Sequence, residues 1–444
     1  MIALAAPLAA GNLLQMAIFT TDVIFVARLG PASLAASTLA VTIVMLIGWS
    51  LTGLTSAASA LIAAELGHKR HALREVRRTM RMGGWLALVF GVGAMGLCLL
   101  AEPLMRATGQ DAEVTSAAGQ FVRLLMWCII PVAFANLLRV FVSTLGRAGI
   151  GTAITLLALI VNAIGNWALI YGHLGMPRLG LMGSAWASII TNVAMVAAYA
   201  LVIAADRHFR RYALLGRWWR FDSQRFGQLL RVGLPIAGTI IAEGGLFSSA
   251  AFLMGRIGEA ELAGHSVALQ IAALAFQVPY GVAQAATIRV GLAYGARDAQ
   301  AIARAGWSAI VLGIGFMSVT AGVIWLFPRA ILSIYVDVDD PANLAMIGFA
   351  LQYLSIAAAF QLFDGAQAVS AGALRGLQDT RVPLAIALGG YWIIGFGLAV
   401  ALGLWTPLAG VGVWMGLAAG LVVVSALLLW RWNRRECWGL LPAI

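Results

Sequence analysis

Twelve apolar stretches, each about as long as a bilayer-crossing helix, run through this chain of 444 residues. A transmembrane helix needs roughly 20 predominantly apolar residues, whereas a transmembrane strand needs about 9–11 residues of alternating polarity. These stretches are too long and too uniform for strands, so the sequence predicts an all-α integral membrane protein. Pro131 and Pro279 are expected to interrupt the fourth and eighth helices. The predicted helices lie near residues 5–28, 36–66, 82–100, 117–145, 151–172, 180–204, 229–256, 262–294, 305–327, 344–374, 382–404 and 408–431.

The composition supports the same fold class. Hydrophobic residues make up 61% of the chain and charged residues only 11%, whereas a soluble domain carries about 25% charged residues. Cys98, Cys128 and Cys437 show neither a disulfide framework nor a metal-ligand spacing. Met1 leads directly into an apolar segment without a basic region or a small-residue cleavage site, so we expect a retained first helix and no cleaved signal peptide.

The basic residues are concentrated in alternate loops, although the formal net charge of +11 would also suit a nucleic-acid-binding protein. Cytoplasmic loops of membrane proteins carry an excess of Lys and Arg. We therefore predict a multi-pass protein of a bacterial-type inner membrane, with both termini in the cytoplasm, lipid around it and no nucleic-acid partner. The orientation depends on basic residues after the second helix, after the sixth helix and in the tail, and on one acidic loop of the opposite parity: Lys69, Arg70, Arg74, Arg77, Arg78 and Arg81; Arg207, Arg210, Arg211, Arg217, Arg220 and Arg225; Arg431, Arg434 and Arg435; Asp337, Asp339 and Asp340.

The chain also contains an internal repeat. Residues 7–67 align without a gap onto residues 235–295 after a shift of 228 positions. Two six-helix bundles are expected, related by a pseudo-twofold axis along the membrane normal, because an even number of helices starts both halves on the same face. The predicted parts are an N-terminal bundle over 1–204, a cytoplasmic linker over 205–228, a C-terminal bundle over 229–433 and a tail over 434–444. The matched pairs at helix ends include Pro7/Pro235, Arg28/Arg256, Gly30/Gly258, Gly53/Gly281 and Gly67/Gly295.

Three carboxylates, Asp22, Glu243 and Asp364, fall inside the apolar stretches. A bare charge at such a depth costs at least ~2.5–3.5 kcal/mol on insertion scales, and ionisable residues there generally mark ion or substrate pathways. Asp22, in the middle of the first helix, is predicted to exchange a proton near neutral pH, because a low dielectric penalises its charged form. The alternative for Asp22 is a hydrogen-bonded carboxyl that only fixes helix packing.

Glu243 takes the place of Gln15 in the repeat, and Asp22 aligns with Ala250. Each half therefore keeps one carboxyl on its first helix, at positions seven residues apart in register. Seven residues are close to two helical turns, so both carboxyls face the same side of their helices. We expect the two halves to have different roles, with a structural helix–helix hydrogen bond as the alternative for Glu243.

Asp364 is flanked by Gln361 and Gln367 at three-residue spacing on one helix face. A carboxylate with amide oxygens nearby suits a hard cation such as Na⁺, and it suits an organic ammonium equally well.

Further polar residues lie in the apolar stretches. Asn162 and Asn166, one turn apart, can either join Asp22 in a network or connect helices structurally. Arg289 and Arg139 are interpreted either as buried guanidiniums or as side chains that reach the interface; pairing with a carboxylate is considered for Arg289, and the interface is favoured for Arg139. His265 is expected to serve in packing or capping.

Several enzyme signatures do not occur in the sequence. Lys69 is the only lysine and stands in His-Lys-Arg, so the chain contains no phosphate-binding G-x-x-x-x-G-K-[ST] motif. H-E-x-x-H and G-x-S-x-G are missing too, which argues against the usual zinc protease and serine hydrolase classes. If the buried carboxylates mark a transport pathway, transport would have to draw its energy from an ion gradient, worth about 2.3 kcal/mol per charge per 100 mV.

The residues now described resemble the multidrug and toxic compound extrusion (MATE) family, in its NorM-type branch, over nearly the whole chain. The resemblance is most specific in the run from Gly233-Leu-Pro to Tyr294-Gly295. It is equally clear from Asp364 through Ser370-Ala-Gly-Ala-Leu-Arg-Gly to Asp379, followed by Tyr391-Trp392.

This resemblance implies two six-helix bundles and a secondary active antiporter, not an enzyme, driven by H⁺ or Na⁺ without another cofactor. It implies a cation site at Glu243 and Asp364 in the C-terminal half, with Na⁺ as one occupant. It further implies a protonation site at Asp22 with Asn162 and Asn166 in the N-terminal half.

Gln15, Arg289, Gln361 and Gln367 are predicted to support these sites, and Phe247, Phe360 and Phe363 to contact the cargo. Phe360 stands where NorM-type members often carry a tyrosine, which removes an oxygen ligand for sodium.

The predicted function is export of amphipathic organic cations by a monomer that alternates access between the two sides of the membrane. One alternative is a flippase for lipid-linked or amphipathic metabolites. A second is an uncoupled channel or a membrane scaffold.

Overall fold

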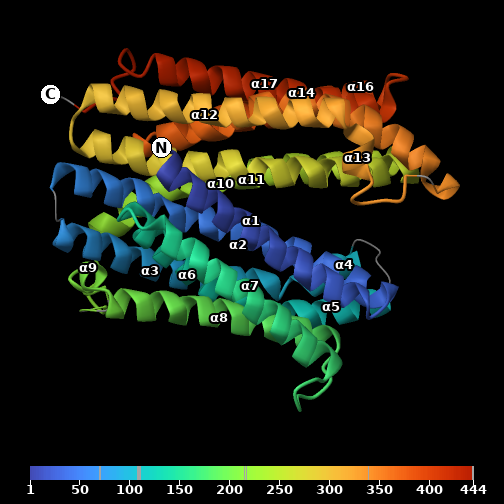
Figure 1. Cartoon of the computed structure of the whole chain (residues 1–444), viewed down its shortest axis with the longest axis horizontal. Coiled ribbons are helices and arrows are strands. Elements are labelled where there is room, and N and C mark those ends of the chain that lie inside the picture. Colours follow the sequence, from blue (N-terminus) through green and yellow to red (C-terminus); the bar gives the residue numbers. More distant parts are fainter. Residues whose placement is uncertain (70–71, 108–111, 215, 217, 339, 443–444) are drawn as a thin grey trace. The chain divides into compact units, whose positions relative to one another are not determined.

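The computed structural model describes residues 1–69, 72–107, 112–214, 216, 218–338 and 340–442, and its regular structure is helical throughout these residues (Figure 1). Arg70, Arg217 and Asp339, used above to predict orientation, lie outside them. Over the described ranges, twelve helical segments are long and apolar enough to cross a membrane, which confirms the predicted fold class. These segments are Ile2–Ala27, Pro31–His68, Leu73–Arg106, Val114–Thr144, Ala148–Tyr171, Leu181–Ala205, Ser223–Ile257, Glu259–Gly295, Ala299–Leu326, Leu344–Gly376, Arg381–Leu404 and Ala409–Asn433.

The chain forms two compact units. The N-terminal unit comprises Ala10–Ala237, and the C-terminal unit comprises Gly238–Ile444 together with Met1–Ala9. The segment predicted as a linker, 205–228, is thus part of the N-terminal unit, and the first nine residues pack with the C-terminal unit.

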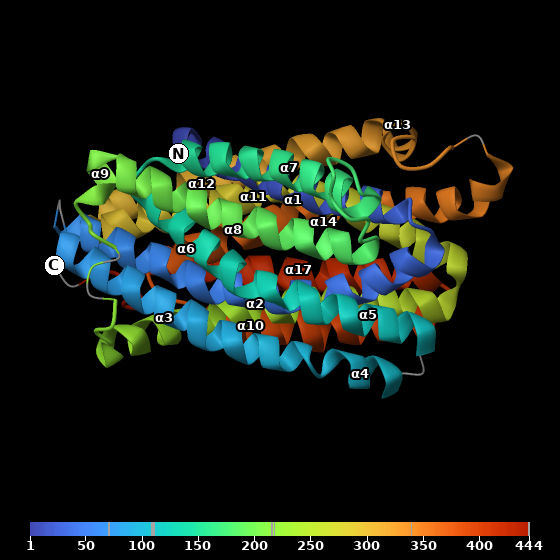
Figure 2. The ribbon, with the colours of Figure 1, turned by 90° about the horizontal axis from the view of Figure 1, so that it is seen from below.

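The N-terminal unit is built mainly from the helices of the first six spans. In it, α2 packs against α3, α5 and α6, and α7 packs against α6 and α8; Figure 2 shows α7 and α8 side by side. The elements are most of α1 (Ile2–Ala27), α2 (Pro31–His68), α3 (Leu73–Cys98), α4 (Ala101–Ala107), α5 (Ala112–Leu125), η1 (Met126–Cys128), α6 (Ile129–Thr144), α7 (Ala148–Tyr171), α8 (Leu181–Ala205), α9 (Arg207–Arg210) and the start of α10 (Ser223–Ile257).

The C-terminal unit is organised around α14, which packs against α11, α12 and α17. A Cβ at Gly372 would lie only 2.4 Å from the carbonyl oxygen of Ala283, so α14 and α11 approach each other closely at this glycine. Thr287 Oγ1 donates to the carbonyl of Gly372 at 2.8 Å and fixes the same contact. Besides most of α10, the elements are α11 (Glu259–Gly295), α12 (Ala299–Leu326), α13 (Pro328–Leu332), η2 (Pro341–Asn343), α14 (Leu344–Gly376), α15 (Arg381–Leu388), η3 (Gly389–Phe396), α16 (Gly397–Leu404) and α17 (Ala409–Asn433).

Proline has different effects in the fourth and eighth spans. The tight 3₁₀ turn η1 separates α5 from α6 just before Pro131, because the proline ring conflicts with the carbonyl four residues earlier, that of Trp127. The interruption predicted at Pro279 is wrong, since α11 continues through it. Membrane helices tolerate proline where neighbouring groups satisfy the freed carbonyl.

The eleventh span contains a π-helix, η3, between α15 and α16. The wider turn brings its glycines against α17: a Cβ at Gly390 would lie 2.3 Å from Val424, and one at Gly395 would lie 3.3 Å from the Cα of Gly420. No sequence feature predicted this change of helix type.

The internal repeat is visible in the helix bounds. Pro31 begins α2 and Glu259 begins α11, at positions 228 residues apart, as the alignment predicted. Gly30, which precedes α2, has φ of 107°, a conformation that favours glycine.

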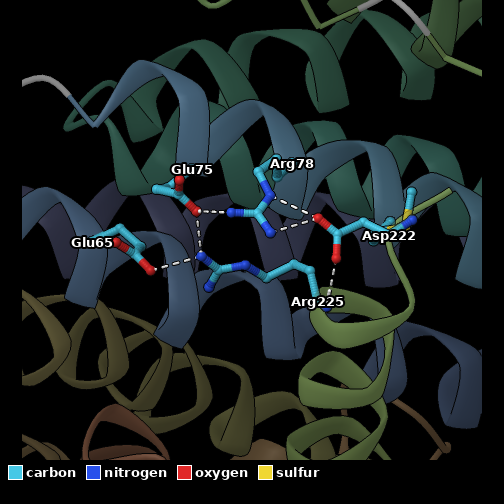
Figure 3. A network of polar contacts seen from close by, with 6 residues as sticks. Glu65, Glu75, Arg78, Asp222 and Arg225 are labelled. Carbon is cyan, nitrogen blue, oxygen red and sulfur yellow. Dashed lines mark hydrogen bonds and ion pairs between the residues drawn. The ribbon is translucent and has the colours of Figure 1, made fainter. Parts of the chain in front are cut away.

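A network of ion pairs ties the start of α10 to α2 and α3 within the N-terminal unit (Figure 3). Arg225 Nη2 donates to Glu65 at 2.9 Å and to Glu75 at 2.6 Å. Arg78 contacts Glu75 at 2.9 Å and Asp222 at 2.7 Å. Asp222 in turn accepts the backbone N–H of Arg225 at 3.1 Å, which caps the N-terminus of α10.

Further contacts anchor the segment that precedes α10. Arg77 Nε donates to the carbonyl of Tyr212 at 2.6 Å, and Trp85 Nε1 donates to that of Trp218 at 3.1 Å. The indole of Trp218 lies so close to Gly84 that an added Cβ would be 2.0 Å away. Arginines interpreted above as orientation signals therefore also stabilise the fold.

Candidate functional site

Asp22 is the centre of a hydrogen-bonded cluster formed by α1, α7 and α8 in the N-terminal unit. Its Oδ1 accepts from Nδ2 of Asn162 at 2.9 Å and from Nδ2 of Asn166 at 2.7 Å. Its Oδ2 accepts from Oγ of Ser188 at 3.3 Å. Both asparagines are fully buried and Asp22 is half-buried. The predicted contact between Asp22 and the two asparagines is therefore present.

The helices of this cluster are fixed by contacts on either side. Asn166 Nδ2 also donates to the backbone carbonyl of Asn162 at 3.0 Å, so the two amides share one face of α7. Tyr171 Oη donates to the carbonyl of Phe25 at 2.9 Å and connects the end of α7 to α1. Sequence reasoning missed Ser188, because serine is common in membrane helices and nothing in its neighbourhood distinguishes it.

The cluster presents a carboxylate with three hydrogen-bond donors inside membrane-spanning helices. Donors of this kind stabilise the charged form, whereas burial favours the neutral form. The same carboxyl can consequently hold a proton or pair with a cation. Gln15, two turns earlier on α1, is half-buried and makes no side-chain hydrogen bond to a described residue.

A second acidic site lies in the C-terminal unit, where α10 carries Glu243 and α14 carries Asp364. Asp364 is only 7% exposed and Glu243 is half-buried. The two charges act on one another, and Arg375 acts on Glu243. Asp364 Oδ1 is buried and has no hydrogen-bond partner among the described residues.

The two glutamines that flank Asp364 do not bond to it. Gln361 Oε1 accepts instead from Thr320 Oγ1 on α12 at 3.2 Å. Gln367 is 3% exposed, and its Oε1 has no partner in the described part of the chain.

The arginine near this site is Arg375, whereas Arg289 was predicted. Arg289 is exposed on α11 and makes no ion pair with a described residue, so the interpretation of a buried pair is wrong. Arg375 follows Asp364 by eleven residues on α14, close to three full turns, which places both on one face. That spacing could have identified Arg375 from the sequence.

The three phenylalanines proposed to contact cargo differ in their surroundings. Phe360 is buried and packs against Trp414 with ring centroids 5.6 Å apart. Phe363 is 39% exposed and Phe247 is half-buried. Phe360 is thus a packing residue here, and contact with cargo remains a prediction for the other two.

Two other polar residues, His265 and Arg139, contact neighbouring side chains within their own units. His265 is fully buried in α11 against Trp414, at a centroid distance of 5.4 Å, which confirms a packing role. Arg139 is half-buried near the end of the fourth span and donates to Oδ1 of Asn12 at 3.3 Å and of Asn136 at 3.1 Å, and its reach to the interface stays a prediction.

The acidic sites do not form a multi-ligand metal centre. In the described ranges, no group of three or more His, Cys, Asp or Glu side chains is placed to hold a metal ion. A sodium ion at Glu243 and Asp364 would need further oxygen ligands besides these two carboxylates.

The fold is that of solved MATE transporters. A eukaryotic MATE transporter, AtDTX14, superposes with a TM-score of 0.87 at 20% identity, over 98% of this chain and 96% of that one. A multidrug resistance MATE family transporter of the MOP superfamily in an outward-facing conformation gives a TM-score of 0.88 at 22% identity, over 100% and 96%.

Sequence comparison identifies the family. A protein of Mesorhizobium japonicum named "Probable multidrug resistance protein NorM" is 43% identical over 98% of this chain and 93% of its own length. The multidrug resistance protein NorM of Burkholderia vietnamiensis is 37% identical over 97% and 92%. The MatE family model matches twice, at residues 7–168 and 235–401, and the two starts have the spacing of the internal repeat. The chain therefore belongs to the MatE family and, as its residues suggested, resembles the NorM-type branch.

Proposed function

We propose that this chain is a multidrug efflux transporter that exports amphipathic organic cations in exchange for H⁺ or Na⁺. Its relatives over nearly the whole length are named as NorM multidrug resistance proteins, which supports this class of cargo. The exchange takes place by alternating access, and the acidic sites of the two units provide the binding groups.

One observation carries the proposal. Asp22, Glu243 and Asp364 all lie in membrane-spanning helices, and none of them forms an ion pair with an arginine or lysine of the described chain. A carboxylate at such a depth is costly without a partner. Protons, sodium ions and organic cations can each bind to such a carboxylate and dissociate from it again.

This competition is the physical basis of exchange. An organic cation and a coupling ion neutralise the same negative charge, so binding of one weakens binding of the other. A ligand shifts a conformational equilibrium only by its differential affinity for the two states. Coupling follows if protonated or sodium-bound carboxyls release the cation toward the outside.

The orientation belongs to the same proposal. The protein lies in a bacterial inner membrane with both termini on the cytoplasmic side. The loops after α2 and α8 are rich in arginine, and loops of this kind remain on the cytoplasmic side. Export then runs from the face that bears the network of Figure 3 toward the opposite face.

The test uses purified protein in proteoliposomes loaded with ethidium. A pH gradient or a sodium gradient is imposed separately, and efflux is followed by fluorescence. Gradient-dependent efflux by one ion supports exchange and identifies that ion. Efflux that ignores both gradients would indicate an uncoupled channel, and lipid translocation without ethidium efflux would indicate a flippase.

A further inference from the structure

Tyr391 is a buried phenol that the proposed exchange has not yet used. It lies on the π-helix η3 and is fully inaccessible to solvent. Its Oη has no hydrogen-bond partner in the described part of the chain. A buried hydroxyl without a partner is unfavourable, so such a group is expected to find a partner in at least one working state.

The next residue fixes η3 against the acidic turn of α10. Trp392 Nε1 donates to the carbonyl of Ala242 at 3.2 Å, one residue before Glu243. A Cβ at Gly245 would lie 2.8 Å from the Trp392 ring, so α10 passes close to the indole. Tyr391 is thereby held beside the helix turn that carries Glu243.

The charged groups around Tyr391 come from two helices of the C-terminal unit, α10 and α14. Glu243 on α10, and Asp364 and Arg375 on α14, lie within electrostatic range of Tyr391. Tyr280 on α11 interacts with Arg375 in turn. Toward α17, the glycines Gly390 and Gly395 of η3 lie against Gly416, Gly420 and Val424.

The location of Tyr391 on a π-helix is consistent with a functional role. π-turns are rare and occur frequently at functional sites, where the extra residue in the turn redirects a side chain. The other ring near Asp364, Phe360 one turn earlier on α14, has no oxygen and packs against Trp414. Tyr391 is then one buried side chain that can offer an uncharged oxygen beside the two carboxylates.

We propose that Tyr391 is a specificity-determining residue of the cation site formed with Glu243 and Asp364. Its hydroxyl supplies an uncharged oxygen to cations that can use one: a protonated amine, which donates N–H, or a sodium ion, which accepts oxygen ligands. A cation shielded on all sides, such as tetraphenylphosphonium, gains nothing from this oxygen. The inference rests on the proposed function.

The experiment measures tetraphenylphosphonium binding to the full chain in lipid nanodiscs, with displacement by Na⁺ in one arm and by phenethylammonium in the other. For Tyr391→Phe we expect tetraphenylphosphonium affinity within about twofold of wild type and about tenfold more competitor for half-displacement in at least one arm, as for loss of one hydrogen bond to a charged group. A shift only with Na⁺ assigns the oxygen to the coupling ion. A shift only with phenethylammonium assigns it to the cargo.

Tyr353→Phe is the matched control. Tyr353 is also fully buried in the C-terminal unit with an unbonded hydroxyl, but it stacks on Trp414 at 5.9 Å and belongs to the aromatic cluster around it. This variant should leave both displacement curves unchanged. If Tyr391→Phe does not fold, Tyr391→Met, which also lacks the hydroxyl, takes its place.

Three results would overturn the inference: unchanged displacement in Tyr391→Phe, equal shifts in Tyr353→Phe, or no displacement by either cation from wild type. In each of these cases tetraphenylphosphonium still binds, so the proposed function stands. A wild-type protein that does not bind tetraphenylphosphonium would instead contradict the proposed function.

Discussion

At the scale of single residues, the Asp22 cluster shows how a carboxylate is kept inside a membrane without an arginine. Two amides and a hydroxyl, from α7 and α8, surround its oxygens at 2.7–3.3 Å. Hydrogen bonds to a charged group contribute about 1.5–3 kcal/mol each. These donors can rearrange when a proton or a cation arrives, whereas a fixed guanidinium would occupy the carboxylate permanently.

Asn166→Ala should therefore slow coupled ethidium efflux by about tenfold, because it removes the shortest hydrogen bond to Asp22 and leaves the remaining charge less stable. Efflux rates in proteoliposomes, normalised to reconstituted protein, provide the measurement. Asn192→Ala is the control, since Asn192 donates to the carbonyl of Ser188 and not to Asp22. Equal rates for the two variants would show that the Asp22 cluster serves packing alone.

The residues of the Asp22 cluster were only partly predictable. A carboxyl in an apolar stretch and two amides one turn apart are visible in any reading of the sequence, and their contact follows once α1 and α7 are neighbours. Ser188 and Arg375 were missed because one is a common small residue and the other stands near a helix end, where arginine is ordinary. The prediction that Arg289 pairs with a carboxylate was wrong because Arg289 is exposed. Periodicity alone did not determine which face of the helix carries it.

At the scale of elements, glycine determines how closely the helices approach. On α12, a Cβ at Gly306 would lie 1.9 Å from the ring of Trp432, whereas one at Gly315 would meet nothing within 4 Å. Trp432 is fully buried, so its rigid indole cannot move aside without disturbing α17. We expect Gly306→Ala to destabilise the protein by about 1–3 kcal/mol, the usual cost of overpacking.

Gly315→Ala is the matched substitution on the same helix and should be neutral or stabilising by up to about 1 kcal/mol, the difference in helix propensity. Thermal unfolding of both variants in detergent provides the comparison. A lower midpoint for Gly315→Ala than for Gly306→Ala would contradict the proposed packing of α12 against α17.

The ion pairs that anchor the segment before α10 should make the stability of the fold depend on pH. Hydrogen bonds from Arg78 lower the pKa of Asp222 below its ordinary value of 3.8. A carboxyl with a lowered pKa stabilises the fold at every pH above its ordinary value, and that contribution disappears as the pH falls through the lowered value. Asp222→Asn should therefore unfold at a lower temperature than wild type at neutral pH, and the difference should shrink below about pH 3.8.

The measurement is the thermal midpoint of both proteins across this pH range. Glu259→Gln, which removes an exposed carboxylate at the start of α11, is the control and should show no comparable difference. A gap between Asp222→Asn and wild type that stays constant down to the lowest pH would rule out the ion pair with Arg78 as its source.

The number and approximate positions of the helices could be predicted from the sequence, but their local geometry could not. Twelve runs of apolar residues are sufficient to predict twelve spans, and the repeat predicted the start of α11 from that of α2. The π-helix η3 and the continuity of α11 through Pro279 depend on which neighbours satisfy the displaced carbonyls. Those neighbours come from helices far away in sequence, so local pattern carries no signal for them.

At the scale of the whole molecule, the two units share the internal sequence repeat but have different acidic sites. The N-terminal unit surrounds one carboxylate with amides and a hydroxyl, and the C-terminal unit places two carboxylates, an arginine and a buried phenol together. At equivalent positions of the repeat, Gln15 corresponds to Glu243 and Asp22 corresponds to Ala250.

The most direct test compares ethidium efflux, driven by an imposed ion gradient in proteoliposomes, for wild type and for Asp22→Asn, Glu243→Gln and Asp364→Asn, with Glu259→Gln as the control. Each of the first three variants should lose nearly all gradient-driven efflux while the control retains it, because a neutral amide cannot exchange a proton or pair with a cation. Wild-type rates in all three would contradict the claim that carboxylates within the membrane carry the exchange.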